Sequence, residues 1–127
     1  MSQSAAQIDI LIVEDDEQTH TALMSLVRRM GYEPRGACSI DEALEAVTHS
    51  APEVLITDWD LGEHRSGIDV ATRAKALRND CKVVFCSGNN LGLLRQQTRH
   101  LEICRYIKKP ISLTRLRDEV AAVLAQP

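Results

Sequence analysis

Short apolar runs alternate along the chain with longer segments in which apolar residues recur at helical spacing. Such runs between turn residues predict buried strands, and apolar residues three or four apart predict amphipathic helices. Nearly continuous apolar strands that alternate with helices predict a parallel sheet covered on both faces, an α/β fold. We expect strands at residues 8–13, 33–38, 53–57, 82–86 and 103–107, and helices at 17–30, 39–48, 68–77, 91–100 and from 112 onward.

Capping residues mark several of the expected helix ends. Ser39 with Glu42 three residues later forms a capping box, and Ser112 is a good N-cap for the last helix. Gly31 ends the first helix, and Pro52 separates the second helix from the third strand.

The length and composition indicate one globular domain, which we place at residues 8–125. The 127 residues are 44% hydrophobic, enough for a core, and 26% charged, typical of a soluble surface. Residues 1–7 have neither the basic nor the apolar segment of a signal peptide, so we expect a loose leader. No stretch approaches the roughly 20 apolar residues that span a bilayer. These observations predict a cytoplasmic protein with no membrane partner.

The cysteines give no sign of a metal or redox site. Cys38, Cys81, Cys86 and Cys104 lack C-x-x-C spacing and a neighbouring His cluster. We expect free, mostly buried thiols in a reducing compartment, in preference to a zinc site or a redox couple.

The net charge of −3 conceals a strong asymmetry. Residues 1–70 hold 14 acids and 4 Lys or Arg, whereas residues 71–127 hold 4 acids and 11 Lys or Arg. The basic half lacks interleaved aromatics and a recognition-helix motif, which argues against nucleic acid binding. It therefore indicates a solvated helical surface or a protein-docking face.

Polar side chains follow the expected strands at their carboxyl ends. In open parallel sheets ligands bind at this edge, so these groups should converge. The groups are Glu14, Asp15 and Asp16 after the first strand, Asp58 after the third, Ser87 after the fourth and Lys109 after the fifth.

Together these groups predict phosphoryl transfer. Crowded carboxylates repel one another unless a cation neutralises them, and oxygen ligands favour Mg²⁺, with Mn²⁺ or Ca²⁺ as substitutes. Lys109 would bind a phosphoryl oxygen, and Ser87 would contact another. Asp58 is the candidate nucleophile, giving an aspartyl phosphate. Each residue alone is a weak signal; a strand-terminal Asp, for example, is most often a helix cap. The hypothesis of phosphoryl transfer rests on their combination.

The same residues resemble the receiver domain of two-component response regulators. The resemblance covers about residues 8–125, and its motifs match in order and spacing as well as in residue type. The matching segments are ILIVEDD at 10–16, VLITDWDL at 54–61, VVFCSG at 83–88 and YIKKP at 106–110. It implies a flavodoxin-like three-layer (βα)5 sandwich with strand order 2-1-3-4-5.

The resemblance also implies a chemical role for each matching position. Asp58 would be the phosphoacceptor and Lys109 the phosphoryl ligand. Glu14 and Asp15 would hold Mg²⁺ together with Asp58, and the backbone carbonyl of Asp60 would complete the protein's ligands. The chain would be a signalling domain that assists its own phosphorylation and slow dephosphorylation, rather than an enzyme.

Further positions would transmit or tune the signal. The resemblance implies that Ser87 is the switch hydroxyl, that Tyr106 is the switch aromatic, and that Pro110 shapes the turn after Lys109, commonly through a cis bond. We expect Asp60 and Asn89 to set the lifetime of the aspartyl phosphate.

The resemblance implies partners as well. A histidine kinase or a phosphotransfer protein would supply the phosphoryl group. A downstream effector or a second copy would bind the face of the fourth helix, fifth strand and fifth helix.

The sequence departs from the family pattern in two places. Gly62 stands where a Pro is usual, and the loop from Asp58 to Gly67 is about one residue longer than usual. Leu101, Glu102 and Ile103 replace small residues before the fifth strand, which affects the fourth helix and the output geometry.

Two alternatives stay open from the sequence. Asp58-Trp-Asp60 resembles the D-x-D motif of haloacid dehalogenase-like phosphatases, although that motif follows their first strand. A receiver-like adaptor that works without phosphate is the second alternative, and the intact site residues argue against it.

Overall fold

The computed structural model describes residues 8–59, 66–88, 90–110 and 112–125. Its strands form one parallel sheet in the order β2-β1-β3-β4-β5, as predicted. The strands are β1 (Ile10–Val13), β2 (Arg35–Ala37), β3 (Val54–Asp58), β4 (Lys82–Ser87) and β5 (Arg105–Lys108). The helices are α1 (Glu17–Arg29), α2 (Ile40–His49), α3 (Gly67–Leu77), α4 (Leu91–Gln97) and α5 (Leu113–Leu124).

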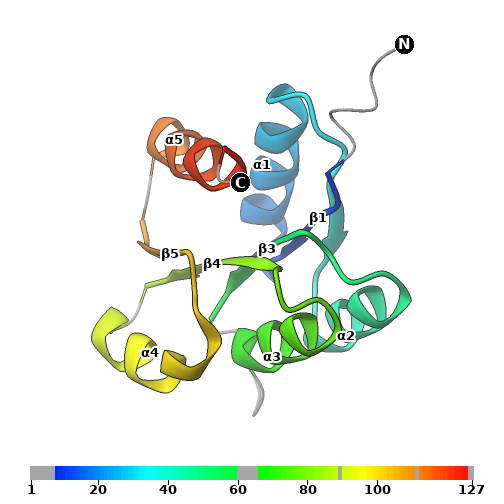
Figure 1. The fold of residues 1–127 in the computed structure, drawn as a ribbon. Coiled ribbons are helices and arrows are strands. Elements are labelled where there is room, and N and C mark those ends of the chain that lie inside the picture. The colour runs from blue at the N-terminus through cyan, green and yellow to red at the C-terminus, as the bar shows by residue number, and fades with distance from the viewer. Residues whose placement is uncertain (1–7, 60–65, 89, 111, 126–127) are drawn as a thin grey trace.

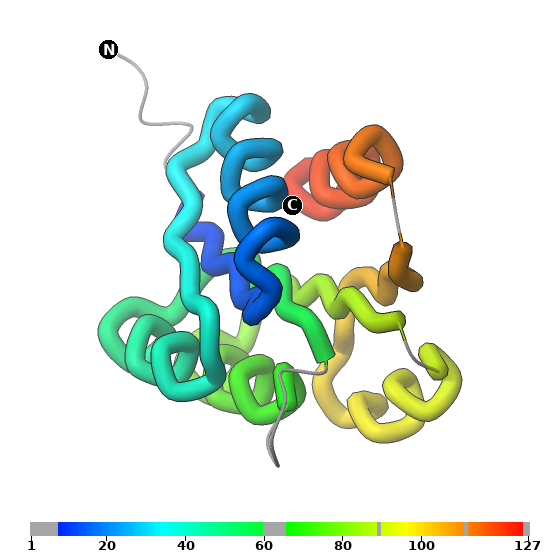
Figure 2. Tube along the Cα trace, turned by 180° about the vertical axis from the view of Figure 1, so that it is seen from behind, coloured from blue at the N-terminus to red at the C-terminus, as the bar shows by residue number. Residues whose placement is uncertain are grey.

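Helices cover both faces of the sheet. Helices α1 and α5 lie on one face, and α2, α3 and α4 lie on the other (Figure 1). The view from behind shows the same three layers (Figure 2). No helix in the described part of the chain is both long and apolar enough to cross a membrane.

The core consists of two apolar clusters, one on each side of the sheet. Alternate strand residues face opposite sides, so Leu11 and Leu55 pack towards α2 and α3, whereas Ile12 and Ile56 pack towards α1 and α5. Aliphatic residues and Ala supply most of both clusters, with Phe85 as the one fully buried aromatic among the described residues. The core thus follows directly from the apolar strand runs.

The expected helix at 91–100 was wrong over its last three residues. Helix α4 ends at Gln97, and a 3-10 turn at Arg99–Leu101 follows it. The buried Thr98 keeps the helical hydrogen bond from its N–H to the carbonyl of Leu94, at 3.0 Å, and its hydroxyl donates to the same carbonyl at 2.8 Å. Glu102 then takes a left-handed conformation with φ 52°, which turns the chain towards β5.

Several strand bounds also differ from the expected ones. Strand β1 begins at Ile10 and not at residue 8. Strand β2 is shorter than residues 33–38, and β5 lies later than residues 103–107. Residues 1–7, expected as a leader, lie outside the described residues.

Arg35 connects β1, β2 and α2 at the amino ends of the strands. Its guanidinium donates two hydrogen bonds to the carboxylate of Asp9, at 2.9 and 3.1 Å. It also donates to the carbonyls of Ala46 and Ser50, at 3.0 and 2.6 Å. The ends of α2 and of the edge strand are therefore held by one planar group that lysine cannot imitate.

We expect Arg35→Lys to lower the free energy of unfolding by about 1–2 kcal/mol, because the ammonium loses the paired geometry and leaves carbonyls unsatisfied. Urea denaturation measures the change. The matched control is Arg28→Lys on the exposed surface of α1, which should cost less than about 0.5 kcal/mol. Equal losses in the two variants would contradict the role of Arg35.

Candidate functional site

The strand register brings the predicted polar groups to one edge of the sheet. Thr57 pairs with Val13, so the next residues, Asp58 and Glu14, lie side by side at the carboxyl ends of β3 and β1. On the other side Asp58 pairs with Cys86. Ser87 pairs with Lys108 across β4 and β5, immediately before Lys109. Most of the groups predicted to meet at this edge therefore do so. Asp16 is the exception, because its side chain caps α1 and accepts the N–H of Thr19 at 2.9 Å.

Asp58 is the last residue of β3 and is only 8% exposed. The backbone after it is fixed, because Trp59 donates its N–H to the carbonyl of Cys86 at 2.9 Å. Gly67, the first residue of α3, donates to the carbonyl of Trp59 at 2.9 Å. A side chain at Gly67 would collide with the backbone carbonyl of Asp58. Close packing of α3 thus fixes the position of Asp58.

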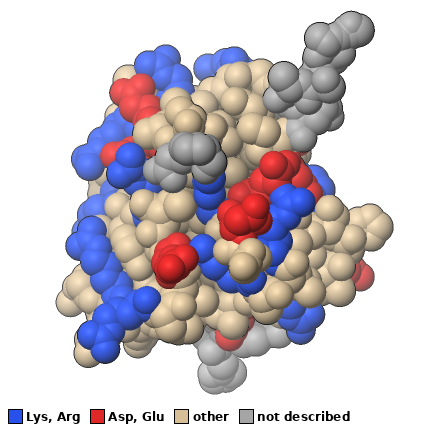
Figure 3. Space-filling view, viewed as in Figure 1, with Lys and Arg blue, Asp and Glu red and all other residues tan. Residues whose placement is uncertain are grey.

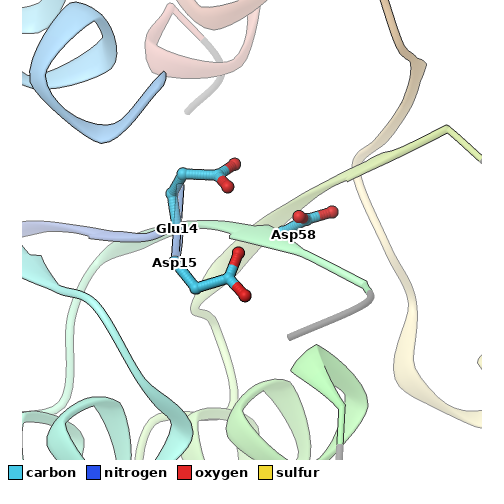
Figure 4. Close-up of side chains that lie close together, drawn as sticks. All are labelled: Glu14, Asp15 and Asp58. Carbon is cyan, nitrogen blue, oxygen red and sulfur yellow. The ribbon is translucent and has the colours of Figure 1, made fainter. Parts of the chain in front are cut away.

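Glu14, Asp15 and Asp58 form an acidic cluster in which one oxygen of each lies within 4.8 Å of the others. The first two carboxylates come from the end of β1 and the third from the end of β3 (Figure 4). Glu14 and Asp58 are buried, whereas Asp15 is exposed. An all-oxygen donor set that is open on one side fits a hard cation such as Mg²⁺.

The Lys109 ammonium lies between two of these carboxylates. Its Nζ is 3.0 Å from Oε1 of Glu14 and 3.1 Å from Oδ2 of Asp58. The other oxygen of Glu14 accepts the N–H of Asp16 at 3.0 Å. The backbone N–H of Lys109 donates to the carbonyl of Ser87 at 2.8 Å. Hydrogen bonds of both its side chain and its backbone therefore hold Lys109 in place. The peptide bond from Lys109 to Pro110 is cis, as expected.

Burial is the main influence on the charge of Asp58. It raises the pKa of this carboxyl, the Lys109 ammonium lowers it in part, and the charge of Glu14 raises it further. A cavity beside the site is lined mainly by apolar groups from α1, α5 and the strands, which accounts for the poor solvation. A cation bound next to Asp58 would favour its ionised form.

Burial has the opposite effect on the pKa of Lys109. Burial lowers its pKa, but the hydrogen bond to Glu14 and the charge of Asp58 outweigh burial, so the pKa is raised. Lys109 therefore stays a cation at neutral pH.

Ser87 and Tyr106, the two predicted switch residues, lie on the neighbouring strands β4 and β5. Ser87 is fully buried at the end of β4. The Tyr106 ring stacks on Phe85 with centroids 6.4 Å apart, and its hydroxyl lies 2.6 Å from the hydroxyl of Thr98. The guanidinium of Arg95 lies 5.1 Å from the ring centroid. The aromatic ring is thus held against α4 by a hydrogen bond and a cation–π contact.

Two predicted site residues, Asp60 and Asn89, lie outside the described residues, as does Gly62 in the altered loop.

Three contributors to the site were not identified from the sequence: Gly67, Arg95 and Thr98. Gly67 carried a signal, since it ends the loop after Asp58, but its close approach to Asp58 depends on how α3 packs. The sequence carried no signal for Arg95 or Thr98, because an exposed Arg and a Thr are common in surface helices.

The free cysteines agree with the sequence reading for the most part. Cys81 and Cys86 are buried, and burial raises the pKa of the Cys86 thiol to about 12. Cys38, at the end of β2, is exposed.

Comparison with known families identifies one that matches most of the chain. The profile of the response regulator receiver domain matches residues 10–121. Sporulation initiation phosphotransferase F of Bacillus subtilis is 24% identical over 115 residues, which are 91% of this chain and 92% of that protein. The DNA-binding transcriptional regulator NtrC of Azospirillum brasilense is 25% identical over 91% of this chain, which spans only 24% of the length of NtrC.

Solved structures share the fold. The non-phosphorylated HemR receiver domain from Leptospira biflexa has a TM-score of 0.87 at 23% identity, covering 95% of this chain and 97% of that one. A CheY-like response regulator receiver domain protein from Methanospirillum hungatei has a TM-score of 0.84 at 22% identity, covering 93% and 94%. At these identities the structures establish the fold alone.

Because the pKa of Asp58 is raised by burial, its ionisation costs stability, and this cost grows as the pH rises through the raised pKa. We expect Asp58→Asn to have a higher urea midpoint than the parent chain at pH 7 without metal. The difference should shrink as the pH falls below about 3.9, the ordinary pKa of Asp, because the carboxyl is then protonated in the unfolded chain as well as in the folded one. The exposed Asp80→Asn is the control, and an equal gain there would contradict the burial argument.

We expect Gly67→Ala to destabilise the chain by about 1–3 kcal/mol, because the new methyl group displaces the backbone of Asp58. Gly88→Ala is the control, since a Cβ there would have Lys109 Cβ at 3.9 Å as its nearest neighbour. Its stability should be unchanged or slightly higher. Urea denaturation measures the free energy of unfolding of both variants. An equal change in Gly67→Ala and Gly88→Ala would contradict the packing argument.

Proposed function

We propose that this chain, which belongs to the response regulator receiver domain family, accepts a phosphoryl group on Asp58 from a histidine kinase or a histidine-containing phosphotransfer protein. The observation that carries the proposal is the arrangement around Asp58. Its carboxylate has Lys109 Nζ at 3.1 Å, and one oxygen each of Glu14 and Asp15 lies within 4.8 Å of it. A nucleophile, a fixed cation and a candidate metal site thus share one edge of the sheet.

In the proposed reaction an oxygen of Asp58 forms a bond to phosphorus while the bond from phosphorus to the histidine nitrogen breaks. The electron pair of that bond stays on the nitrogen, and a proton on the other ring nitrogen makes the leaving group a neutral imidazole. Lys109 neutralises charge on a phosphoryl oxygen without giving up its proton, because its pKa is raised. The product is an aspartyl phosphate, and the protein's contribution is position and charge.

Glu14, Asp15 and Asp58, with the backbone carbonyl of Asp60, are the proposed ligands of Mg²⁺, and Mn²⁺ is a chemically suitable substitute. When bound, the cation supplies positive charge that offsets the carboxylates and the phosphoryl oxygens. The exposure of Asp15 supports an open side for cation entry. Within the described residues, Glu14 has a second task, since it also holds Lys109.

We propose that phosphorylation changes the environment of Ser87 and, through it, the conformation of Tyr106. The hydroxyl of Ser87 would contact a phosphoryl oxygen, and Pro110 would keep Lys109 in place. Asp60 and Asn89 are proposed to adjust how fast water removes the phosphoryl group. The output would be a changed protein-binding face in a cytoplasmic signalling pathway, with no catalysis of a separate substrate.

Incubation with acetyl phosphate and Mg²⁺ should add one phosphoryl group to the intact chain, as measured by mass spectrometry. Asp58→Asn should abolish the adduct because the nucleophile is gone. Lys109→Gln should lower its yield at least about tenfold, since the phosphoryl charge loses its fixed partner. Chelation of Mg²⁺ should also prevent labelling.

Asp80→Asn is the matched control and should be labelled like the parent chain. An adduct that persists in Asp58→Asn would contradict the proposed acceptor. Continuous release of phosphate from an unrelated phosphate ester would contradict the signalling role and favour a phosphatase.

A further inference from the structure

A cavity of about 70 Å³ lies between α1, α5 and the sheet, beside Asp58. Helices α1 and α5 cover the same face of the sheet (Figure 1), and the cavity lies near their amino-terminal ends. Most of its lining is apolar and comes from Val13 and Ile56 on the strands, Ala22 and Leu23 on α1, and Leu113 and Leu116 on α5. The proposed reaction uses none of these apolar side chains.

Most of the polar side chains that line the cavity already have hydrogen-bond partners. Both carboxylate oxygens of Glu14 accept hydrogen bonds, one from Lys109 and one from a backbone N–H. The hydroxyl of Thr57 donates to the carbonyl of Asp58 at 3.0 Å, and that of Thr19 donates to a carboxylate at the start of α1 at 2.7 Å. The lining therefore leaves few partners for a water molecule, which needs about two to four of them in such a space.

Cys86 adds a thiol to the lining, next to Asp58, with which it pairs across β3 and β4. Burial raises the pKa of this thiol to about 12, so it stays protonated at neutral pH. A protonated thiol behaves as a small apolar group with only a weak S–H donor. Cys86 therefore adds to the apolar character of the cavity and offers no charge to a bound molecule.

The size of the cavity and the chemistry of its lining define what it can hold. An engineered apolar cavity of roughly 150 Å³ in another protein stays dry and binds benzene or xenon. The cavity beside Asp58 is about half that size, so it fits a xenon atom or a short aliphatic molecule better than an aromatic ring. A charged molecule would lose its hydration on entering, and the apolar lining would not replace it. The lining thus favours a small, neutral, apolar ligand.

Leu113 gives the cavity an apolar rim at the surface. It is 48% exposed, one of three large apolar side chains that are well exposed in the described part of the chain. The outer surface is otherwise rich in charge, as Figure 3 shows for the Lys and Arg side chains gathered over α4 and beside β5. An apolar molecule in solution therefore finds an exposed leucine where the cavity meets solvent.

We propose that this cavity binds a small neutral apolar molecule and that the bound molecule slows phosphorylation of Asp58. The second part rests on the proposed function. Asp58 lines the cavity, so an apolar molecule there keeps water from one side of its carboxyl group. Phosphorylation brings further negative charge to this group, and charge that is poorly solvated costs free energy. Binding in the cavity and phosphorylation therefore oppose each other, and by linkage phosphorylation weakens the binding.

Xenon is a suitable probe, because it is neutral, apolar and small enough for the cavity. NMR spectra of the full chain under increasing xenon pressure, without a phosphodonor, should show saturable shifts of the methyl signals of Leu23, Ile56 and Leu116. Ala22→Leu should weaken xenon binding at least about tenfold, because the larger side chain occupies the cavity. The matched control is Ala121→Leu, the same change at an exposed position of α5, which should bind xenon like the parent chain.

Propane and the dimethylammonium ion have the same shape and differ in charge, so they test the class of ligand; propane should bind in the cavity and the ion should not. Circular dichroism checks the fold, and Ala22→Met, with a more flexible side chain, is the second variant. If neither variant folds, the positions of the shifted methyl groups in the parent chain decide.

Four outcomes overturn the proposed binding site. They are the absence of saturable shifts, equal shifts of methyl groups remote from the cavity, undiminished xenon binding by a folded Ala22 variant, and preferential binding of dimethylammonium. A dimer in light scattering that Ala22→Leu abolishes overturns it in favour of a second copy.

The effect on phosphorylation is measured as the initial rate of labelling by acetyl phosphate and Mg²⁺. Saturating xenon should lower this rate about fivefold relative to helium at the same pressure, and Ala22→Leu should be labelled at one rate under both gases. An unchanged rate in a parent chain that binds xenon overturns the proposed opposition. A failure of labelling under helium refutes the proposed function, while the NMR shifts still decide whether the cavity binds xenon.

Discussion

The Lys109 ammonium, held between the carboxylates of Glu14 and Asp58, is the interaction on which the site depends. A parallel sheet brings the carboxyl ends of its strands together, and here that places two acids from the end of β1 beside one from β3. Like charges at this spacing repel, and burial increases the cost. One ammonium balances part of the charge and leaves an excess of negative charge, which a divalent cation fits.

The same lysine links the site to the elements that would carry a signal. Its backbone N–H bonds to the carbonyl of Ser87, and β5 places Tyr106 three residues before it. Tyr106 in turn contacts α4 through Thr98 and Arg95. A continuous route therefore leads from Asp58 to the surface, through hydrogen bonds, the backbone of β5 and a ring contact.

The apolar strand runs predicted a parallel sheet, and the strand-terminal polar residues predicted the meeting of Glu14, Asp58, Ser87 and Lys109, because both patterns obey local rules. The order of the strands came from the family resemblance. It did not predict the break of α4, where the buried Thr98 bonds to a backbone carbonyl and a tyrosine hydroxyl. It also missed Gly67, whose importance comes from the approach of α3 to Asp58. These features depend on contacts between elements, which propensity and spacing do not encode.

Chemical trapping of the acceptor tests the central claim most directly. Sodium borohydride reduces an aspartyl phosphate to homoserine, because the acyl phosphate is a reactive mixed anhydride and free carboxylates are not. The chain would be labelled with acetyl phosphate and Mg²⁺, reduced, digested and mapped by mass spectrometry. We predict homoserine at position 58 and at no other acid. Homoserine at Asp15 or at another acid, or none at all in a folded chain that has gained a phosphoryl group, would contradict this account.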